Sequence, residues 1–580
     1  MTNYYSNVPP QDQRPSLIGI IVFIGLLFII LLIRLFHLQI NTFDDYARES
    51  EENRITQKRV KAARGLILDR NSRVLVRNRP FYTVYLTKTT ETHYNRIKDA
   101  FIVATGDSSI DGRYDDKLRN IRLKRDVDFR TVSIVEEQLR LQWPMLSIET
   151  EAQRYYPFGN SAAHLLGYMG LYQSDNNENY ILGDFIGKTG LEKLYEKTLR
   201  GFDGVRYFEI DASGHVRREF TQRLQAPQPG KDLQLTIDVD LQQEIEHAFP
   251  DSLSGAVVVL DVRSGAILAM VNHPTFDPNI FVSFQSQNDR IKVLNSKNTL
   301  LNRAIRGRYP PGSTLKMIGA IAALESGVTD TLSTFAACVG SLQVGDVTFR
   351  CNLRSGHGEL SLIPAIETSC NTYFQHLAQM ISIEEWEMWA NKFGIGQPTG
   401  FQFTPNEAEG LLPSRSYYQQ NGGWTIGHLL NMIIGQGAIL VTPLQMARFV
   451  AAIANGGYMV TPHLNGPAPP SKYVEDLSPH TLEIIQQAML RVVSGVKGTG
   501  KRAAIENINV AGKTGTAQVP NRINQNNDAW FVGFSPFDNP EIAVVVVVEG
   551  GGGGGKVAAP IAQKAFAEYH RINDRFTMSR

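Results

Sequence analysis

Tyr309-Pro-Pro-Gly-Ser313-Thr-Leu-Lys316 is the stretch from which the rest of the chain is interpreted. Two prolines and a glycine end an extended segment, and Ser313 then opens an apolar helical pattern that runs to about Glu325. Ser313 and Lys316 are three residues apart, so they share one helix face. A serine hydroxyl needs a nearby base to become a nucleophile, and a buried lysine with a lowered pKa can serve. The stretch therefore predicts a nucleophilic serine at a helix N-terminus, where free N–H groups suit a developing oxyanion.

A serine and a lysine at this spacing also occur by chance, as in Ser494-Gly-Val-Lys497, so this stretch alone is weak evidence. Two further segments strengthen the prediction. Ser369-Cys370-Asn371 lies in a helical pattern, 56 residues after Ser313, and Lys513-Thr514-Gly515-Thr516 lies before the terminal strands. Three other segments have the same residue types as these motifs but precede Ser313 in the chain, so they do not fit the order of the set: Ser286-Gln-Asn288, Ser296-Lys-Asn298 and Lys188-Thr-Gly190. Order and spacing together indicate the motif set of the penicillin-binding and β-lactamase serine enzymes.

Apolar patterning predicts an α+β fold in which strands at both ends of one domain surround a helical middle. Residues 225–232 (QAPQPGKD) are rich in proline, glycine and glutamine and predict a linker. The expected strands are Leu233–Ile237, Ala256–Leu260, Ala266–Val271, Ala529–Gly533 and Ile542–Val548. The expected helices are Leu315–Glu325, Pro364–Met380, Glu384–Phe393 and Val557–Ile572.

The N-terminal region contains one strongly apolar run, LIGIIVFIGLLFIILLI, from Leu17 to Ile33. Its length is close to the minimum that spans a bilayer, and no small-residue cleavage site follows it, so we expect an uncleaved anchor rather than a removed signal peptide. Arg14 and Arg34 flank it on opposite sides, so the positive-inside rule gives almost no orientation. The short tail and the single span favour a large domain outside the cytoplasm. The net charge of +1 gives no indication of nucleic-acid binding.

With these segments in order, the chain resembles the class B penicillin-binding proteins, which are monofunctional D,D-transpeptidases, over nearly its whole length. Further segments carry the resemblance: Arg64-Gly-Leu-Ile-Leu-Asp69-Arg70-Asn71, Arg154-Tyr-Tyr-Pro157 with Ala163-His164, Gly190-Leu-Glu192 with Tyr195-Glu196, and Gly255–Asp261 through Asp277-Pro278-Asn279. The resemblance implies a cytoplasmic tail (1–16), a transmembrane anchor (17–38), a mixed α/β dimerisation-type pedestal domain (39–240) and a transpeptidase domain with an antiparallel sheet flanked by helices (241–580).

The resemblance also implies a role for each motif residue. Ser313 attacks the penultimate D-Ala carbonyl of a stem pentapeptide, and Lys316 accepts and returns the proton. Ser369 relays a proton to the leaving amine, Asn371 binds the substrate amide, and Lys513 with Thr514, Gly515 and Thr516 holds the terminal carboxylate. The N–H groups of Ser313 and Thr516 form the oxyanion hole. β-Lactams acylate the same serine, and acyl transfer itself needs no cofactor.

The three cysteines of the chain, Cys338, Cys351 and Cys370, fall in one window together with His357. A Cys3His set suits a closed structural zinc site, although the intervening spacings are longer than in zinc fingers. A disulfide with one leftover thiol and a set of plain core thiols are the alternatives. Elongation-specific members of the family in some Gram-negative bacteria resemble this arrangement, with a zinc site near the second motif.

The cysteine cluster, the short tail and the pedestal motifs favour the elongation type over the division type, which is the alternative. The resemblance then implies an inner-membrane protein with its catalytic domain in the periplasm. Its expected partners are an acceptor stem peptide, a polytopic membrane glycosyltransferase and other elongation-complex proteins. A β-lactamase needs neither anchor nor pedestal, and a non-catalytic scaffold is disfavoured because all three motifs are complete.

Overall fold

The computed structural model describes residues 17–44, 55–87, 89–110, 112, 114, 120–173, 180, 184–210, 216–221, 224–283, 286–296, 298–403, 405–519 and 526–578. They form two compact units. The N-terminal unit contains the described residues up to Ala63 together with those from Gly201 to Pro229. The main unit contains those from Arg64 to Arg200 and from Gly230 onward.

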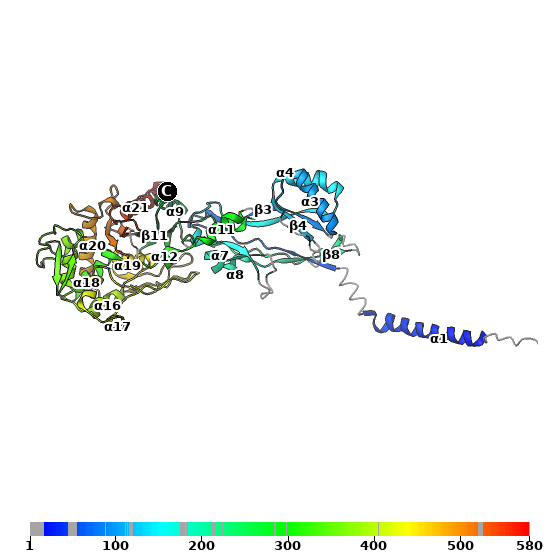
Figure 1. The fold of residues 1–580 in the computed structure, drawn as a ribbon, viewed down its shortest axis with the longest axis horizontal. Helices are drawn as coiled ribbons and strands as arrows, with labels where there is room; N and C mark the ends of the chain where they lie inside the picture. Colours follow the sequence, from blue (N-terminus) through cyan, green and yellow to red (C-terminus); the bar gives the residue numbers. More distant parts are fainter. Residues whose placement is uncertain are drawn as a thin grey trace, which may run out of the picture. The chain divides into compact units, whose positions relative to one another are not determined.

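The N-terminal unit contains the apolar helix and a small sheet (Figure 1). Helix α1 (Leu17–Phe36) continues into one π-helical turn, η1 (His37–Asn41), and the most apolar 18-residue window of this segment has a mean hydropathy of 3.0. Within the described part of the chain this is the one helix long and apolar enough to cross a membrane. The sheet is antiparallel, in the order β1-β8-β9, with bounds β1 (Ile55–Val60), β8 (Gly204–Ile210) and β9 (Val216–Glu219).

The first half of the main unit is built on a long strand, β3 (Val74–Thr87). It pairs with β4 on one edge and β5 on the other. Helices α3 and α4 pack over the C-terminal end of β3 and close a small apolar core there. A buried ion cluster stabilises the other end, because Arg64 and Arg154 both contact the fully buried carboxylate of Glu192. The elements here are β2 (Ile67–Leu68), α3 (Glu91–Thr105), β4 (Asn120–Val127), α4 (Phe129–Ile134), η2 (Val135–Leu139), α5 (Arg140–Gln142), β5 (Leu146–Tyr155), α6 (Ala163–Leu166), β6 (Met169–Leu171), β7 (Phe185–Gly187), α7 (Gly190–Leu194) and α8 (Glu196–Arg200).

The second half of the main unit contains a five-stranded antiparallel sheet in the order β12-β11-β19-β18-β17 (Figure 1). Along the central strand β19, Val545 and Val547 face one apolar core, whereas Val544 and Val546 face another. Because both faces are covered, the strand is a continuous apolar run rather than an alternating one. The strands are β11 (Ser254–Asp261), β12 (Ile267–His273), β17 (Ala511–Ala517), β18 (Asp528–Ser535) and β19 (Ile542–Glu549). The predicted α+β sheet from distant chain segments is confirmed.

Helices cover both faces of this sheet. One face packs against α9 (Val239–Ala248) and α21 (Ala558–Met578), and the other packs against the helical middle of the chain. The remaining elements are β10 (Leu233–Gln234), α10 (Asn279–Val282), α11 (Gln287–Asn295), α12 (Arg303–Arg306), η4 (Gly312–Leu315), α13 (Lys316–Glu325), β13 (Ser341–Val344), β14 (Val347–Arg350), α14 (Leu362–Glu367), α15 (Asn371–Leu377), α16 (Ile383–Lys392), α17 (Arg415–Gln420), α18 (Ile426–Met432), α19 (Pro443–Ala454), β15 (Tyr458–Met459), β16 (Lys472–Tyr473), α20 (Pro479–Ser494) and η5 (Lys501–Ala503).

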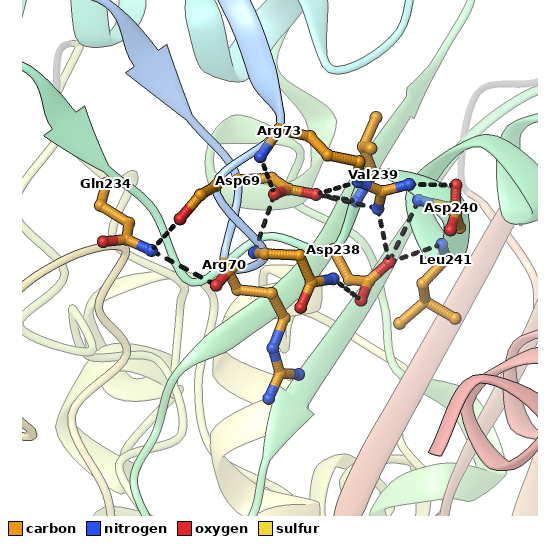
Figure 2. Close-up of polar contacts among 10 residues, drawn as sticks. Asp69, Arg70, Arg73, Gln234, Asp238, Val239, Asp240 and Leu241 are labelled. Carbon is orange, nitrogen blue, oxygen red and sulfur yellow. Dashed lines mark hydrogen bonds and ion pairs between the residues drawn. The ribbon is translucent and has the colours of Figure 1, made fainter. Parts of the chain in front are cut away.

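The two halves of the main unit are joined by a polar contact that Figure 2 shows. Asp69, which follows β2, is fully buried and accepts hydrogen bonds from the backbone of Arg73 and from its guanidinium group. Arg73 also reaches Asp238 and Asp240 at the start of α9, where Asp238 is the N-cap residue. We call these residues (Asp69, Arg73, Asp238 and Asp240) the joint.

The prediction of one helix from Pro364 to Met380 was wrong. The segment breaks into α14 and α15, and Ser369 lies at the break with a φ of 59°. A serine in the left-handed region cannot continue an α-helix, and Cys370 is extended and serves as the N-cap of α15. The second motif is therefore a corner between two helices.

Candidate active site

Ser313 lies in the 3-10 turn η4, one turn before α13 begins at Lys316. Gly312 has a φ of 57°, and its N–H donates to the Gly435 carbonyl at 2.8 Å. The backbone of residue 435 is so close that a Cβ there would lie 2.0 Å from the Gly312 carbonyl oxygen. Close packing thus fixes the turn, which leaves Ser313 partly exposed while Lys316 is fully buried.

The ammonium group of Lys316 connects the first two motifs. Its Nζ donates to the Ser369 carbonyl at 2.6 Å, to Ser369 Oγ at 3.2 Å and to Asn371 Oδ1 at 2.7 Å. Among the described residues, no hydrogen bond joins Lys316 to Ser313. The base candidate is therefore held by the second motif, and Ser313 shares the cleft with Ser369 and Asn371.

Ser369 Oγ also contacts the third motif, because Lys513 Nζ donates to it at 2.9 Å and to the Thr514 carbonyl at 3.1 Å. One hydroxyl group thus lies between two fully buried lysines. Its left-handed backbone is the kind of local strain that is stored at functional sites.

Burial changes the proton affinity of both lysines. Removal from water disfavours the charged ammonium, and this lowers the pKa of Lys316 to about 8, against a smaller opposite effect of Cys370 and Cys351. The pKa of Lys513 is also lowered well below its usual range, first by burial and then by the charge of Lys316. A neutral amine that can accept a proton near neutral pH is therefore available beside Ser369.

Strand β17 carries the third motif at the edge of the sheet, since among the described strands it pairs with β18 alone. Thr514 and Thr516 line the cleft. A Cβ at Gly515 would approach the Pro311 carbonyl oxygen to 3.0 Å, so the glycine allows the strand to pack against the segment that holds Ser313. The whole motif lies within this one strand, Ala511–Ala517.

Two parts of the cleft wall were not predicted as functional from the sequence. Thr499 bonds to Thr514 through their hydroxyl groups at 2.7 Å, and the backbone of Gly554 donates to Thr516 Oγ1 at 3.4 Å. A Cβ at residue 554 would lie 2.3 Å from the Gly515 carbonyl oxygen, so only glycine fits there. The run of six glycines at residues 550–555 was the available signal. Ser494, which shares the serine–lysine spacing of the first motif, ends helix α20 instead, and its hydroxyl group donates to the Leu490 carbonyl.

The cleft has a volume of about 1120 Å³, more than a typical small-molecule pocket. All three motifs contribute to its lining, which includes Ser313, Ser369, Asn371, Thr514 and Thr516. The fully buried Lys316 and Lys513 lie behind this surface and contact it through Ser369.

The three cysteines and His357 converge behind the second motif. Their ligand atoms all lie within 4.8 Å of one another, and all three thiols are free rather than paired in a disulfide. Cys351 Sγ lies 3.8 Å from Cys370 Sγ, and His357 Nδ1 lies 3.5 Å from the sulfur atoms of Cys338 and Cys351. Zn–S and Zn–N bonds in a tetrahedron give ligand separations of about 3.5–3.8 Å. The donor set therefore fits zinc in its chemistry, and three of its separations match those of a tetrahedral site.

The cluster directly contacts the corner between α14 and α15. The Asn371 N–H donates to Cys351 Sγ at 3.3 Å, and Cys370 immediately follows Ser369. The hydrogen bond between the two sulfur atoms, more than any other contact, lowers the pKa of the Cys351 thiol well below its usual range. A thiolate at this position is the form that binds metals.

Comparison with known proteins identifies the class first. The model of the penicillin-binding protein transpeptidase domain matches residues 255–567, and that of the penicillin-binding protein dimerisation domain matches residues 59–235. Among curated proteins, the chain is 33% identical to peptidoglycan D,D-transpeptidase MrdA of Haemophilus influenzae, over 96% of this chain and 90% of the relative.

Solved structures agree. A complex between the penicillin-binding protein PBP2 and MreC from Helicobacter pylori matches with a TM-score of 0.78 and 28% identity, over 89% of this chain and 99% of that one. A chain from a study of a peptidoglycan synthase complex that coordinates polymerisation and crosslinking matches with a TM-score of 0.74 and 30% identity, over 95% and 97% of the two chains. The chain therefore belongs to the penicillin-binding peptidoglycan D,D-transpeptidases of the MrdA (PBP2) type. This membership favours an elongation-associated enzyme over a division-associated one.

Proposed function

We propose that the chain cross-links stem peptides during cell-wall elongation through an acyl-enzyme on Ser313, as a serine-type D-Ala-D-Ala transpeptidase with carboxypeptidase side activity. The observation that carries the proposal is the hydrogen-bond network of Lys316, Ser369 and Lys513 beside the partly exposed Ser313. It supplies a buried base, a hydroxyl proton relay and a second cation in one cleft.

In the first step, Ser313 Oγ attacks the carbonyl carbon of the penultimate D-Ala, and its proton passes to neutral Lys316. The C–N bond to the terminal D-Ala then breaks, and Ser369 returns a proton to the leaving amine. An amine from a second stem peptide attacks the ester, restores the Ser313 hydroxyl and forms the cross-link. Water in place of that amine gives the carboxypeptidase reaction.

The third motif binds the substrate in this proposal. The terminal carboxylate is held by Lys513, Thr514 and Thr516, and the free edge of β17 pairs with the extended peptide. An arriving carboxylate favours the charged form of Lys513, so carboxylate binding and protonation of this lysine are coupled. The N–H groups of Ser313 and Thr516 are the proposed oxyanion donors, and Asn371 binds the substrate amide.

We further propose that Cys338, Cys351, His357 and Cys370 hold a structural zinc ion. Such an ion would neutralise the thiolates and fix the helix that begins at Asn371. It takes no part in acyl transfer, and the chain's own residues carry every chemical step.

For localisation and partners, we propose a single-pass inner-membrane protein with the main unit in the periplasm. The apolar helix α1 supports the anchor. The related PBP2 from Helicobacter pylori is in complex with MreC, and another relative belongs to a peptidoglycan synthase complex, which supports partners of the elongation machinery, a membrane glycosyltransferase among them.

Labelling with a fluorescent penicillin tests the proposal. The wild-type protein should form a stable covalent adduct, and Ser313→Ala should form none while keeping the wild-type melting temperature. Absence of label on the folded wild type would exclude the enzyme, and rapid loss of label would indicate a β-lactamase. Depletion in cells should give rounded cells, whereas filaments would indicate the division role.

A further inference from the structure

The cleft that holds Ser313 has a one-sided charge. Among the described residues, its lining includes five cationic side chains and no aspartate or glutamate. They are Arg350, Arg354, Lys501, Arg502 and Lys556. The whole chain is balanced, with 58 lysines and arginines against 57 acids, so this excess belongs to the cleft. Like charges gathered without acids repel one another, and such a field suits an anionic ligand.

The cations lie beside two different parts of the site. Lys501 and Arg502 follow Thr499, which bonds to Thr514 at the proposed position of the terminal carboxylate. Arg350 lies beside the second motif, because its carbonyl accepts a hydrogen bond from Asn371 Nδ2 at 3.1 Å. Arg354 follows it by four residues, in the segment between Cys351 and His357 of the cysteine cluster.

Two of the three cations on the side of the third motif are already engaged, because the side chain of Lys501 donates to the Val496 carbonyl and that of Arg502 to the Lys556 carbonyl. The exposed Lys556 is a single cation on that side, whereas two arginines stand together near the second motif. The side chains of Arg350 and Arg354 are exposed, and neither takes part in an ion pair or hydrogen bond among the described residues. Their backbone is nevertheless well held, by the β13–β14 hairpin and by Cys351, whose N–H donates to the Gly340 carbonyl.

We propose that Arg350 and Arg354 bind a second carboxylate of the peptide substrate, one that lies upstream of the D-Ala-D-Ala end. This inference rests on the proposed function, because it takes the terminal carboxylate to be bound by Lys513, Thr514 and Thr516. The guanidinium group presents paired donors that match a carboxylate, and two arginines beside the residue that binds the substrate amide can reach a side group of the same peptide. The substrate class is thus a peptide with at least two carboxylates.

The test compares two synthetic donor peptides that end in D-Ala-D-Ala. One has a free carboxylate on an upstream residue, and its twin has a carboxamide there. With the full-length protein in detergent, we expect the carboxylate peptide to release terminal D-alanine with about tenfold higher kcat/KM. In Arg350→Gln/Arg354→Gln, that ratio should fall to about one.

Arg263→Gln is the matched control, because Arg263 is exposed but lies outside the cleft lining, and the ratio should remain at the wild-type value. Fluorescent penicillin labelling reports whether each variant still has a folded cleft, and Arg354→Gln alone serves if the double variant does not fold. A wild-type ratio near one, or a double variant that keeps the ratio, would overturn the inference and leave the proposed function standing. Wild-type protein that penicillin does not label would overturn both.

Discussion

Ser369 is the residue at which the three motifs meet, because its hydroxyl group accepts hydrogen bonds from both Lys316 and Lys513. A proton relay at this position contributes a factor of about 10²–10⁴ to the rate. We predict that Ser369→Ala lowers kcat for D-alanine release by about that factor. Its control is Thr368→Ala, since the Thr368 hydroxyl donates to the Pro364 carbonyl and does not contact either lysine. Equal losses in the two variants would contradict the relay role.

The pKa of Lys316 predicts how acylation depends on pH. The neutral amine is the form that accepts the Ser313 proton, and burial lowers the pKa to about 8. Protonation increases as the pH falls, so the acylation rate with fluorescent penicillin should rise about tenfold per unit well below that pKa and level off above it. Stopped-flow or timed-gel labelling between pH 6 and 9.5 measures this. A flat profile would show that Lys316 is not the base.

Sequence order gave the candidate residues Ser313, Ser369 and Lys513, which the structure brings together at one cleft, but it did not give the residues that shape that cleft. The three candidates stand out because the order of their motifs along the chain is distinctive. Thr499 and Gly554 were not, since their importance lies in contacts to β17 that only the fold creates. A run of glycines has no side-chain pattern, so the sequence does not predict that Gly554 approaches Gly515 closely. That contact follows only from the arrangement of the strands.

At the scale of elements, the corner between α14 and α15 depends on the cysteine cluster that lies behind it. We predict that Cys351→Ser loses bound zinc, lowers the melting temperature by several degrees and slows penicillin acylation, because the Asn371 N–H loses its sulfur acceptor. Metal analysis, thermal denaturation and labelling measure the three effects. A wild-type protein without zinc and with one reactive free thiol would refute the metal site.

The joint between the two halves of the main unit gives a second prediction at this scale (Figure 2). Asp69 is fully buried and accepts backbone and guanidinium hydrogen bonds, whereas Asp240 is about half exposed. Asp69→Asn should therefore cost about 2–4 kcal/mol of stability, because it leaves buried donors unpaired. Asp240→Asn should cost less than about 1 kcal/mol. Denaturant unfolding compares the two, and equal effects would show that the joint does not depend on burial.

For the whole molecule, the sheet could be predicted from the sequence, but the break in the helix at Ser369 and the pairing of the segment 225–232 could not. Apolar runs near residues 256–271 and 529–548 predicted strands, and the α+β class followed from their separation along the chain. The break at Ser369 was missed because helical periodicity continues across it, and the reason for the break, contact with two buried lysines, is tertiary. The segment 225–232 was expected to be a linker, yet Gln225 and Gln228 form backbone bridges to Val205 and Phe202.

The anchor sets the topology of the entire chain. Helix α1 is apolar from Leu17 to Ile33, before Arg34 in its last turn, and it is the single candidate span within the described residues, so the described residues after Asn41 should lie on one side of the membrane. Because the proposed substrate is cell-wall peptide, that side should be the periplasm. Protease added to intact spheroplasts should then remove the full-length band, as detected with an antibody against the C-terminus, while a cytoplasmic marker survives. Protection of the chain until the spheroplasts are lysed would place the main unit in the cytoplasm and contradict the topology.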